Sequence, residues 1–492
     1  MRQMLRRLPE PLRRLARGSL LGPVLTLLTG TVAAQGLAYL ARPLLTRLFT
    51  PDAFGVLGFY LAAVTVLSTV ASGKYEDAVL LPASDRDAAG VAALALGLGT
   101  VAALFSLALL PLHGPIAAAL DRPDVALALL LVPAGLLATV WGRTAELWLT
   151  RMDRFRPISG AKVTQNAVMV PAQIGAGAAG GTALGLMGGH LAGRIVGTVV
   201  LLARAWRGTR ALVPHTADLR RLAARYRRFP LYAMPSGFLN TFSMQLPAFF
   251  LLALFAPDVL GYYVLAYGTL AVPMQLLGGA VGQVFFARAA EARWEGTLGP
   301  LARTVFGRLS ALGLFPMAAL TIAAPAAFSV VFGAEWREAG VYAQLLAPWL
   351  YFVFVSAPLS SLFDVLERQP LELGFNVVVV AARAAALWFG GQYGGPLGAV
   401  GLFGAVSAVL WLGHTVWMLR WSGVALREAA RVVGRHVLIA AGPLALVVAA
   451  TALGASDGLV VAVLVGTGLV WLGLTARFEP GLWPRPAEDA LS

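Results

Sequence analysis

The sequence contains no cysteine and only five histidines, and this scarcity excludes several kinds of site. Without cysteine there is no disulfide framework, no thiolate nucleophile and no cysteine-based metal centre. The histidines lack the spacing of metal ligands; they are His113, His190, His215, His414 and His436. The chain also lacks a Walker A pattern, a Ser-His-Asp arrangement and a catalytic pair of acids. We therefore expect no bound metal, no cofactor, no ATP hydrolysis and no catalytic residues.

Charged residues are also scarce, at 13% of the chain, whereas 58% of the residues are hydrophobic and the mean hydropathy is +0.75. A soluble protein of 492 residues would need more charge to cover its surface. Apolar runs of about 20 residues, long enough to cross a bilayer core of roughly 30 Å, recur along nearly the whole chain. They predict an all-α polytopic membrane protein with about 14 transmembrane helices. The predicted spans are 20–41, 55–76, 88–111, 124–147, 158–179, 182–205, 230–252, 260–287, 307–329, 340–364, 372–391, 397–419, 436–454 and 458–476.

The positions of the basic residues predict how the chain is oriented. The formal net charge is +14, and with the N-terminus in the cytoplasm almost every basic residue outside the spans falls on the cytoplasmic side. The exceptions are Arg42, Arg47, Arg122 and Arg337. We therefore expect both termini on the cytoplasmic side of a cell inner membrane. The basic residues are then expected to contact anionic lipid headgroups and not nucleic acid.

The first span has the basic start of a signal peptide, together with a possible cleavage sequence at residues 32–34 (VAA). Its apolar character continues through Leu44 and Leu45, which is too long for a cleaved leader. We expect the span to be retained, with cleavage as the alternative.

Two octets repeat each other along the chain. Residues 48–55 (LFTPDAFG) and residues 254–261 (LFAPDVLG) share Leu, Phe, Pro, Asp and Gly in the same places. Each octet lies between two long apolar segments, which indicates two homologous six-helix halves, a common plan of secondary transporters. The predicted parts are an interfacial basic N-terminus (1–19), a first lobe (20–206), a basic cytoplasmic linker (207–229), a second lobe (230–420), two additional helices (421–476) and a cytoplasmic tail (477–492).

The linker is the most basic loop and contains a short amphipathic helix. Asp218 can cap this helix, which carries Leu219, Leu222 and Tyr226 on one face and arginines elsewhere. We expect an in-plane connector that rests on the membrane; the alternative is a contact site for substrate headgroups or a partner protein. The predicted external loops are short, the longest being about 112–123. None can hold an external catalytic domain, so we do not expect an enzyme.

Ionisable side chains inside a bilayer are costly and are therefore functional candidates. Arg194 and Arg383 fall in the middle of the sixth and eleventh spans, too deep for their charged ends to reach the surface. Arg143 lies near the end of the fourth span with Glu146 one turn later, and Arg42 ends the first span. Guanidinium groups bind phosphate in a bidentate manner, so these four arginines predict a cationic, anion-binding substrate cavity. The structural alternatives are an Arg143–Glu146 ion pair and an Arg42 side chain that extends to the outer headgroups.

Polar side chains inside the spans predict that this cavity contains water. Asn376 precedes Arg383 by seven residues, and Gln35 precedes Arg42 by seven, so each pair shares a helix face. Hydrogen bonds between helices are the structural alternative for such residues. The predicted polar residues of the cavity are Gln35, Glu146, Asn166, Asn240 and Asn376.

Three segments resemble a known family. Residues 42–55 (RPLLTRLFTPDAFG) and 74–82 (KYEDAVLLP) look like the N-terminal signature of Wzx-type flippases of polysaccharide biosynthesis. Residues 332–340 (FGAEWREAG) look like the corresponding loop of the second half. These flippases belong to the multidrug/oligosaccharidyl-lipid/polysaccharide exporter superfamily, and the resemblance spans about residues 20–420.

The resemblance implies a fold of two six-helix lobes and a function. The implied function is to move undecaprenyl-diphosphate-linked oligosaccharides from the cytoplasmic to the periplasmic leaflet by alternating access. The product would enter lipopolysaccharide O-antigen, capsule or exopolysaccharide, with a polysaccharide polymerase and glycosyltransferases as partners. In some members cavity arginines bind the diphosphate, which agrees with Arg143, Arg194 and Arg383. We expect a monomer.

Three other hypotheses remain open. A multidrug or metabolite cation antiporter of the same superfamily would have acidic and aromatic side chains in its cavity. A membrane polymerase or ligase would need a large external loop with essential acids. A non-transporting scaffold of glycan assembly would use the basic linker as its contact surface. The deep charges are mostly basic, with Glu146 as the main acidic exception, which favours an anionic substrate.

Overall fold

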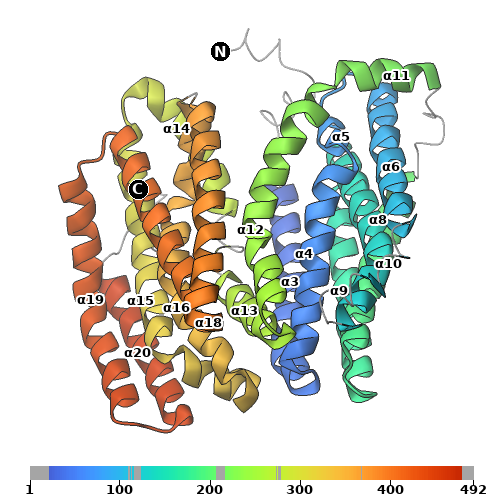
Figure 1. Ribbon diagram of the computed structural model, residues 1–492. Helices are drawn as coiled ribbons and strands as arrows, with labels where there is room; N and C mark the ends of the chain where they lie inside the picture. Colours follow the sequence, from blue (N-terminus) through green and yellow to red (C-terminus); the bar gives the residue numbers. More distant parts are fainter. Residues whose placement is uncertain are drawn as a thin grey trace. The chain divides into compact units, whose positions relative to one another are not determined.

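The computed structural model describes residues 21–108, 111, 114–115, 123–206, 216–272, 274, 279–366 and 368–478. All regular structure in this part of the chain is helical (Figure 1). Within it, 10 helices are long and apolar enough to cross a bilayer. One of these, Pro370–Trp421, is broken at Gly395 and therefore contains two of the predicted spans. The all-α polytopic fold is confirmed, whereas the count of 14 transmembrane helices stays a prediction.

The chain divides into two compact units, unit 1 (Met1–Phe249) and unit 2 (Phe250–Ser492). Unit 1 contains α3 (Leu21–Leu48), α4 (Pro51–Ala71), α5 (Tyr75–Ala78), α6 (Asp85–Ala108), α8 (Pro123–Arg151), α9 (Phe155–Ala178), α10 (Ala183–Trp206), α11 (Thr216–Arg225) and η3 (Phe229–Ala233). The division falls inside α12 (Met234–Leu254). Unit 2 continues with α13 (Pro257–Leu270), α14 (Gly279–Glu295), α15 (Leu298–Phe332), η5 (Ala334–Trp336), α16 (Arg337–Ser356), η6 (Pro358–Ser361), α17 (Leu362–Val365), α18 (Gln369–Trp421), α19 (Leu426–Ala452) and α20 (Asp457–Phe478).

The boundaries of the lobes and the linker that the sequence indicates stay a prediction. The sequence places the division between the lobes in the linker at 207–229, whereas the compact units meet within α12. Residues 207–215 of that linker lie outside the described residues. The predicted N-terminal segment (1–19) and all but the first two residues of the predicted tail (477–492) also lie outside them.

The repeated octets form the same local structure in both units. Pro51 and Pro257 are the first residues of α4 and α13, a position where the missing N–H of proline costs no helical hydrogen bond. Asp52 and Asp258 follow in the first turn, where the helix dipole stabilises a negative charge. The repeated Pro-Asp pair therefore starts an equivalent helix in each unit.

Each octet also packs against a glycine near the end of a later helix. A Cβ atom on Gly177 of α9 would lie 2.8 Å from the leucine that opens the first octet. One on Gly391 of α18 would lie 3.0 Å from the leucine that opens the second. The chain then turns at a left-handed glycine in both units, with φ of 63° at Gly181 and 61° at Gly395. These matching contacts agree with two homologous halves.

Several predicted spans differ from the helices that the structure contains. The tenth, 340–364, is not one helix, since α16 ends at Ser356 and the short helices η6 and α17 follow. The second span, 55–76, ends earlier than predicted, because α4 ends at Ala71 and Gly73 (φ 59°) and Lys74 (φ 61°) after it take left-handed conformations. The eighth span, 260–287, is not one helix, since α13 ends at Leu270 and α14 begins at Gly279. The sequence between them contains a proline, which lacks the N–H that a continuing helix needs.

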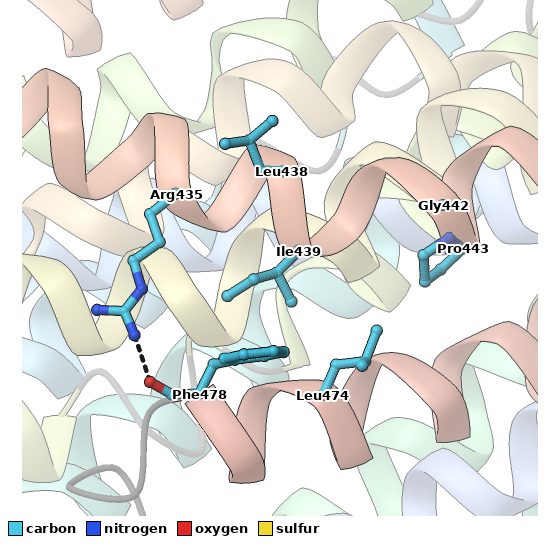
Figure 2. A pocket seen from close by; sticks show the side chains of 7 residues that line it. All are labelled: Arg435, Leu438, Ile439, Gly442, Pro443, Leu474 and Phe478. Atoms are coloured by element: carbon cyan, nitrogen blue, oxygen red, sulfur yellow. Dashed lines mark hydrogen bonds between the residues drawn. The ribbon is translucent and has the colours of Figure 1, made fainter.

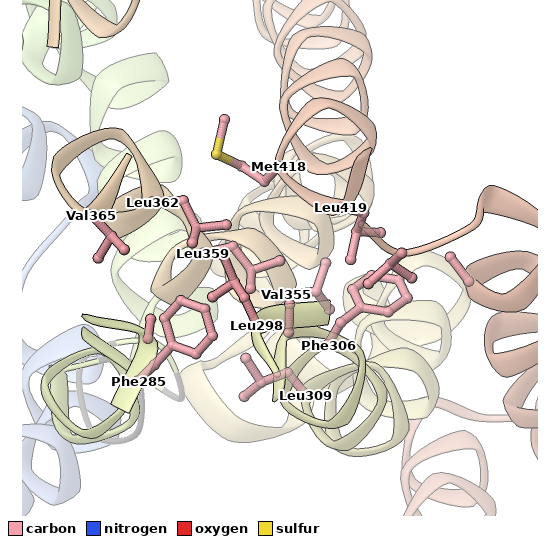
Figure 3. Packing of buried hydrophobic residues seen from close by; sticks show 14 of the residues in the cluster. Phe285, Leu298, Phe306, Leu309, Val355, Leu359, Leu362, Val365, Met418 and Leu419 are labelled. Atoms are coloured by element: carbon pink, nitrogen blue, oxygen red, sulfur yellow. The ribbon is translucent and has the colours of Figure 1, made fainter. Parts of the chain in front are cut away.

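Unit 2 has a buried apolar core at the point where α14, α15, α16, α17 and α18 converge (Figure 3). Phe285 of α14, Leu309 of α15 and Val355 of α16 are each no more than 3% exposed. Leu362 of α17 and Met418 of α18 are fully buried with them. Close packing of this kind holds the ends of five helices in fixed positions.

The linker helix α11 packs against unit 1. Leu222 of α11 is 1% exposed and belongs to the same apolar cluster as Tyr75. The Tyr75 hydroxyl donates a hydrogen bond to the Ala223 carbonyl, at 3.1 Å, and Arg221 Nη2 lies 2.6 Å from Asp87 Oδ1 of α6. Protein therefore covers α11 at Leu222, a contact that the sequence does not indicate because α5 and α6 are distant in sequence. The expected position of this connector on the membrane surface stays a prediction.

Candidate functional site

Four charged side chains on three neighbouring helices of unit 1 form the centre of the candidate site. Arg143 and Glu146 are one turn apart on α8, with 3.9 Å between Arg143 Nη1 and Glu146 Oε2. Lys162 of α9 is closer, with its Nζ 3.2 Å from Glu146 Oε1. Arg194 of α10 lies within electrostatic range of the same carboxylate. The structure thus pairs Arg143 with Glu146, as their spacing suggests, and brings Lys162 and Arg194 to the same acid.

The ion pairs continue from α8 to α5. Asp77 Oδ1 lies 3.8 Å from Arg143 Nη2, and Asp77 Oδ2 lies 3.2 Å from Lys74 Nζ. Sequence reasoning missed Lys74 and Asp77 as site residues, although both lie in the segment that carries the family resemblance. We call the six residues the charge cluster: Lys74, Asp77, Arg143, Glu146, Lys162 and Arg194. Four basic side chains face two carboxylates, which leaves an excess of two positive charges.

Glu76 is a further carboxyl group beside the charge cluster. It is 6% exposed and accepts a hydrogen bond from the Ser72 hydroxyl. Burial raises the pKa of Glu76, because removal from water disfavours the charged form.

A stripe of glycines on α10 allows α9 to approach closely. The stripe recurs every four residues and consists of Gly185, Gly189, Gly193 and Gly197. A Cβ atom on Gly193 would lie only 2.6 Å from the Gln165 carbonyl oxygen of α9. Small residues in such a row let membrane helices pack backbone to backbone. This contact fixes the two helices that carry Lys162 and Arg194.

The charge cluster is accessible and rich in hydrogen-bond donors. The side chains of Arg143 and Lys162 are 51% and 37% exposed, and that of Glu146 is 25% exposed. Arginine offers a planar set of N–H donors that matches phosphate oxygens, and lysine adds a point charge. The arrangement is therefore suited to hold an anion with two charges.

Arg383 lies in unit 2 in a different environment. Its side chain is 4% exposed, and its Nε donates a hydrogen bond to Ser407 Oγ at 3.0 Å. The guanidinium carbon is 4.9 Å from the centre of the Trp349 ring and 5.3 Å from that of Phe403, and the Tyr267 ring stacks on Trp349 at 6.0 Å. No carboxylate among the described residues forms a salt bridge with Arg383. An anion could reach it only if these rings moved, and no sequence periodicity marks the rings as its neighbours.

The other predicted site residues lie on α3, α9, α12 and α18. Arg42 places its guanidinium carbon 4.4 Å from the centre of the Tyr39 ring, and its buried Nη1 has no hydrogen-bond partner. The polar residues are Gln35 on α3, Asn166 on α9, Asn240 on α12 and Asn376 on α18, of which Asn240 is exposed and the others are half-buried. Their roles as cavity ligands, like those of the arginines, stay predictions.

Similar folds occur among solved transporters. The lipid II flippase MurJ in an inward closed conformation has a TM-score of 0.64 and 12% identity, and the match covers 92% of this chain and 99% of MurJ. An inward-facing multidrug resistance MATE family transporter has a TM-score of 0.63 and 16% identity, covering 79% and 94%. A MOP superfamily transporter from Pyrococcus furiosus has a TM-score of 0.53 and 14% identity, covering 84% and 97%. At these identities the likeness establishes the fold alone.

The sequence itself establishes the family. No curated protein matches the chain. The family described as polysaccharide biosynthesis protein matches residues 44–341, which is more than half of the chain. This match and the transporter fold agree with the resemblance carried by the repeated segments. The chain belongs to the family described as polysaccharide biosynthesis protein, and its fold is the one seen in the solved MOP superfamily transporters.

Proposed function

We propose that the protein is a flippase for undecaprenyl-diphosphate-linked oligosaccharides. It moves them from the cytoplasmic to the periplasmic leaflet by alternating access of its two halves, without chemical change to the substrate. The observation that carries this proposal is the charge cluster of unit 1, with its excess of two positive charges and the exposed side chains of Arg143 and Lys162.

The chemistry of the charge cluster matches a diphosphate. Arg143 is half-exposed and presents a guanidinium group that can take two phosphate oxygens at once. Lys162 and Arg194 approach the same region from the adjoining helices α9 and α10. The carboxylates of Asp77 and Glu146 hold the basic side chains in place when no substrate is bound. An incoming diphosphate then replaces these acids as the partner of the basic groups.

The membrane potential favours outward movement of such a substrate. Moving one charge across 100 mV changes the free energy by about 2.3 kcal/mol. At this potential, moving a diphosphate with roughly two negative charges out of a negative cytoplasm therefore lowers the free energy by about 4–5 kcal/mol. A cation exporter would have to work against the same potential and would need acids in its cavity. The positive excess of the charge cluster supports the anionic substrate.

Outward transport agrees with the membrane topology that the positions of the basic residues predict. Both termini lie in the cytoplasm of the inner membrane, and the substrate is made on that side. The product would serve O-antigen, capsule or exopolysaccharide assembly. A polysaccharide polymerase and glycosyltransferases are then the expected neighbours, and the transporter acts as a monomer.

Leaflet transfer in proteoliposomes tests the function. The substrate is a fluorescent undecaprenyl-diphosphate oligosaccharide, and the wild type is compared with Arg194→Ala and Arg383→Ala. Arg204→Ala on α10 and Arg420→Ala on α18 are matched controls, because both side chains are exposed arginines on the same helices. Binding of the fluorescent lipid to detergent-purified protein provides a second readout that does not need leaflet transfer. It is measured as lipid fluorescence on excitation of the protein's tryptophans.

The outcomes separate the hypotheses. We expect transfer by the wild type and both controls, and loss of transfer in Arg194→Ala and Arg383→Ala while their folding is intact. Transfer that survives both substitutions would keep the flippase and reject these arginines as ligands. No transfer of several glycans at an imposed potential would contradict the flippase and favour the cation antiporter or the scaffold of glycan assembly.

A further inference from the structure

The short helix α5 contacts the linker helix α11 with one side chain and the charge cluster with another. The Tyr75 hydroxyl donates a hydrogen bond to the Ala223 carbonyl of α11, at 3.1 Å. Two residues later, Asp77 Oδ1 lies 3.8 Å from Arg143 Nη2 of α8. Figure 1 shows α5 and α11 at the same end of unit 1. The four residues of α5 therefore connect the candidate anion site to the linker helix.

The backbone before α5 also contacts the chain that follows α11. A Cβ atom on Gly73 would lie 3.5 Å from Pro230 Cβ of η3, and one on Gly237 of α12 would lie 3.1 Å from Lys74 Cε. Gly73 and Lys74 are both left-handed, with φ of 59° and 61°, a conformation that is unfavourable for a residue with a side chain. A single helical turn has too few hydrogen bonds to be stable alone. The position of α5 therefore depends on its contacts with its neighbours.

The position of α5 decides which groups Asp77 can pair with. In this structure the Asp77 carboxylate lies near both Arg143 and Lys74, two basic groups of the charge cluster. An anion that takes these basic groups is repelled by a carboxylate that stays beside them. Asp77 must therefore withdraw when the anion binds, and a docked α11 resists that movement through its bond to Tyr75.

We infer that Tyr75 is a positioning residue that couples anion binding at the charge cluster to the docking of α11. The docked linker helix holds α5, and with it Asp77, in the place that opposes the anion. Anion binding in turn loosens α11, because a coupling between two sites acts equally in both directions. The inference rests on the proposed function, since it takes the charge cluster as the site of the diphosphate. It identifies the linker between the two halves as the element that responds to the substrate.

Binding of inorganic pyrophosphate to the full-length protein in detergent tests the coupling by isothermal titration calorimetry. Tyr75→Phe removes the hydrogen bond to α11 and keeps the ring. Its matched control is Tyr226→Phe, which removes a hydroxyl group from a side chain packed against the same apolar cluster and leaves the bond to Ala223 in place. Asp77→Asn removes the repelling charge, alone and together with Tyr75→Phe.

Two further variants show where the pyrophosphate binds. Arg143→Gln removes a basic group of the charge cluster. Arg435→Gln removes a positive charge from unit 2, where Arg435 lines an apolar groove of about 400 Å³ on α19 and α20 and donates a hydrogen bond to the Phe478 carbonyl (Figure 2). Arg143→Gln should bind pyrophosphate more weakly than the wild type, and Arg435→Gln should bind it equally well.

We expect Tyr75→Phe to bind pyrophosphate about threefold more tightly than the wild type, a change within the range that the loss of one hydrogen bond allows. A purely structural role of Tyr75 predicts weaker binding instead, because a distorted site holds its ligand less well. Asp77→Asn should also bind more tightly, and the addition of Tyr75→Phe to it should bring no further gain. Pyrophosphate should speed amide hydrogen exchange in α11 of the wild type and leave it unchanged in Arg143→Gln.

Binding by Tyr75→Phe that is equal to or weaker than that of the wild type would overturn the coupling. The same gain in Tyr226→Phe, or in the Asp77→Asn background, would also overturn it. Unchanged exchange of α11 in the wild type with pyrophosphate bound would do so without any substitution. A wild type that does not bind pyrophosphate, or that binds it no better than Arg143→Gln, would overturn the charge cluster as the anion site and the coupling with it. Leaflet transfer tests the proposed function separately.

Discussion

Arg383 and Glu76 are both buried ionisable residues, and the structure stabilises them in different ways. Arg383 keeps its charge among the rings of Trp349 and Phe403, whose faces attract a cation, with Ser407 as its hydrogen-bond acceptor. Glu76 has no basic side chain in a salt bridge within the described residues and is held by the Ser72 hydroxyl. These differences predict different responses to substitution and to pH.

Arg383→Lys keeps the charge but removes the planar group and the Nε donor. Lysine cannot stack on Trp349 in the same way, so the free energy of unfolding should fall by about 1–3 kcal/mol. Denaturation of detergent-solubilised protein measures this change. Arg420→Lys, at the exposed end of the same helix, should have the stability of the wild type. Equal stability of Arg383→Lys and wild type would contradict a role for the aromatic rings.

Glu76 should make stability depend on pH. Its folded-state pKa lies above the unfolded value of about 4.5, so the folded protein holds the proton more tightly. This contribution is complete below the unfolded pKa and is lost as pH rises through the raised folded pKa. Lys74 and Asp77 are the charged groups beside it and act in opposite directions. Glu76→Gln cannot ionise and should lack this contribution to the pH dependence.

Thermal unfolding of Glu76→Gln and wild type between about pH 4 and pH 8 measures the effect. The stability of the variant relative to the wild type should rise with pH. Ser72→Ala, which retains the ionisable group, should keep the falling trend. A relative stability of Glu76→Gln that stays constant over this range would show that Glu76 does not titrate as burial requires.

The α9–α10 contact depends on the glycine stripe of α10. A methyl group on Gly193 would press on the backbone of α9 at 2.6 Å, so Gly193→Ala should lower stability by about 1–3 kcal/mol. Gly188 of the same helix has no atom within 4 Å of its Cβ position. Gly188→Ala should therefore be neutral or stabilising by up to about 1 kcal/mol, because alanine favours a helix. Thermal unfolding of the two variants in detergent measures the contrast, and equal effects would contradict this packing.

The docked linker helix α11 makes a second prediction. Leu222 is 1% exposed, and Leu222→Ala should weaken docking by about 2–5 kcal/mol. The arginines of this segment are already exposed, and an undocked helix unfolds more readily, so limited trypsin digestion should cut between residues 216 and 228 faster than in the wild type. Leu219→Ala, which alters a half-buried leucine of the same helix, should have a smaller effect. Unchanged cleavage in Leu222→Ala would show that α11 does not depend on this contact.

Local sequence signals predict the helices well and their partners poorly. Apolar run length identifies α6 and α10. The end of α4 at Ala71 follows from left-handed residues, one of which, Lys74, is not glycine and carries no sequence signal. The Arg143–Glu146 pair follows from a spacing of one turn, whereas the approach of Lys162 depends on helix packing.

At the scale of the whole molecule, the two halves have turns at equivalent positions but different charged side chains. Asn376 precedes Gly395 by the same number of residues that separates Lys162 from Gly181. The first half thus places a lysine where the second half has an asparagine. The exposed cations of the charge cluster belong to unit 1, while Arg383 of unit 2 is enclosed by aromatic rings. A duplicated fold has therefore acquired two different basic sites.

The most direct test of transport is the rate of leaflet transfer by the wild-type protein at an imposed membrane potential. Proteoliposomes carry the fluorescent undecaprenyl-diphosphate oligosaccharide in one leaflet, and protein-free liposomes measure the uncatalysed rate. The proposed function predicts protein-dependent transfer that is faster when the leaflet of origin is on the negative side, because the diphosphate carries net negative charge. Transfer no faster than in protein-free liposomes, for several glycans and at either sign of the potential, would contradict it.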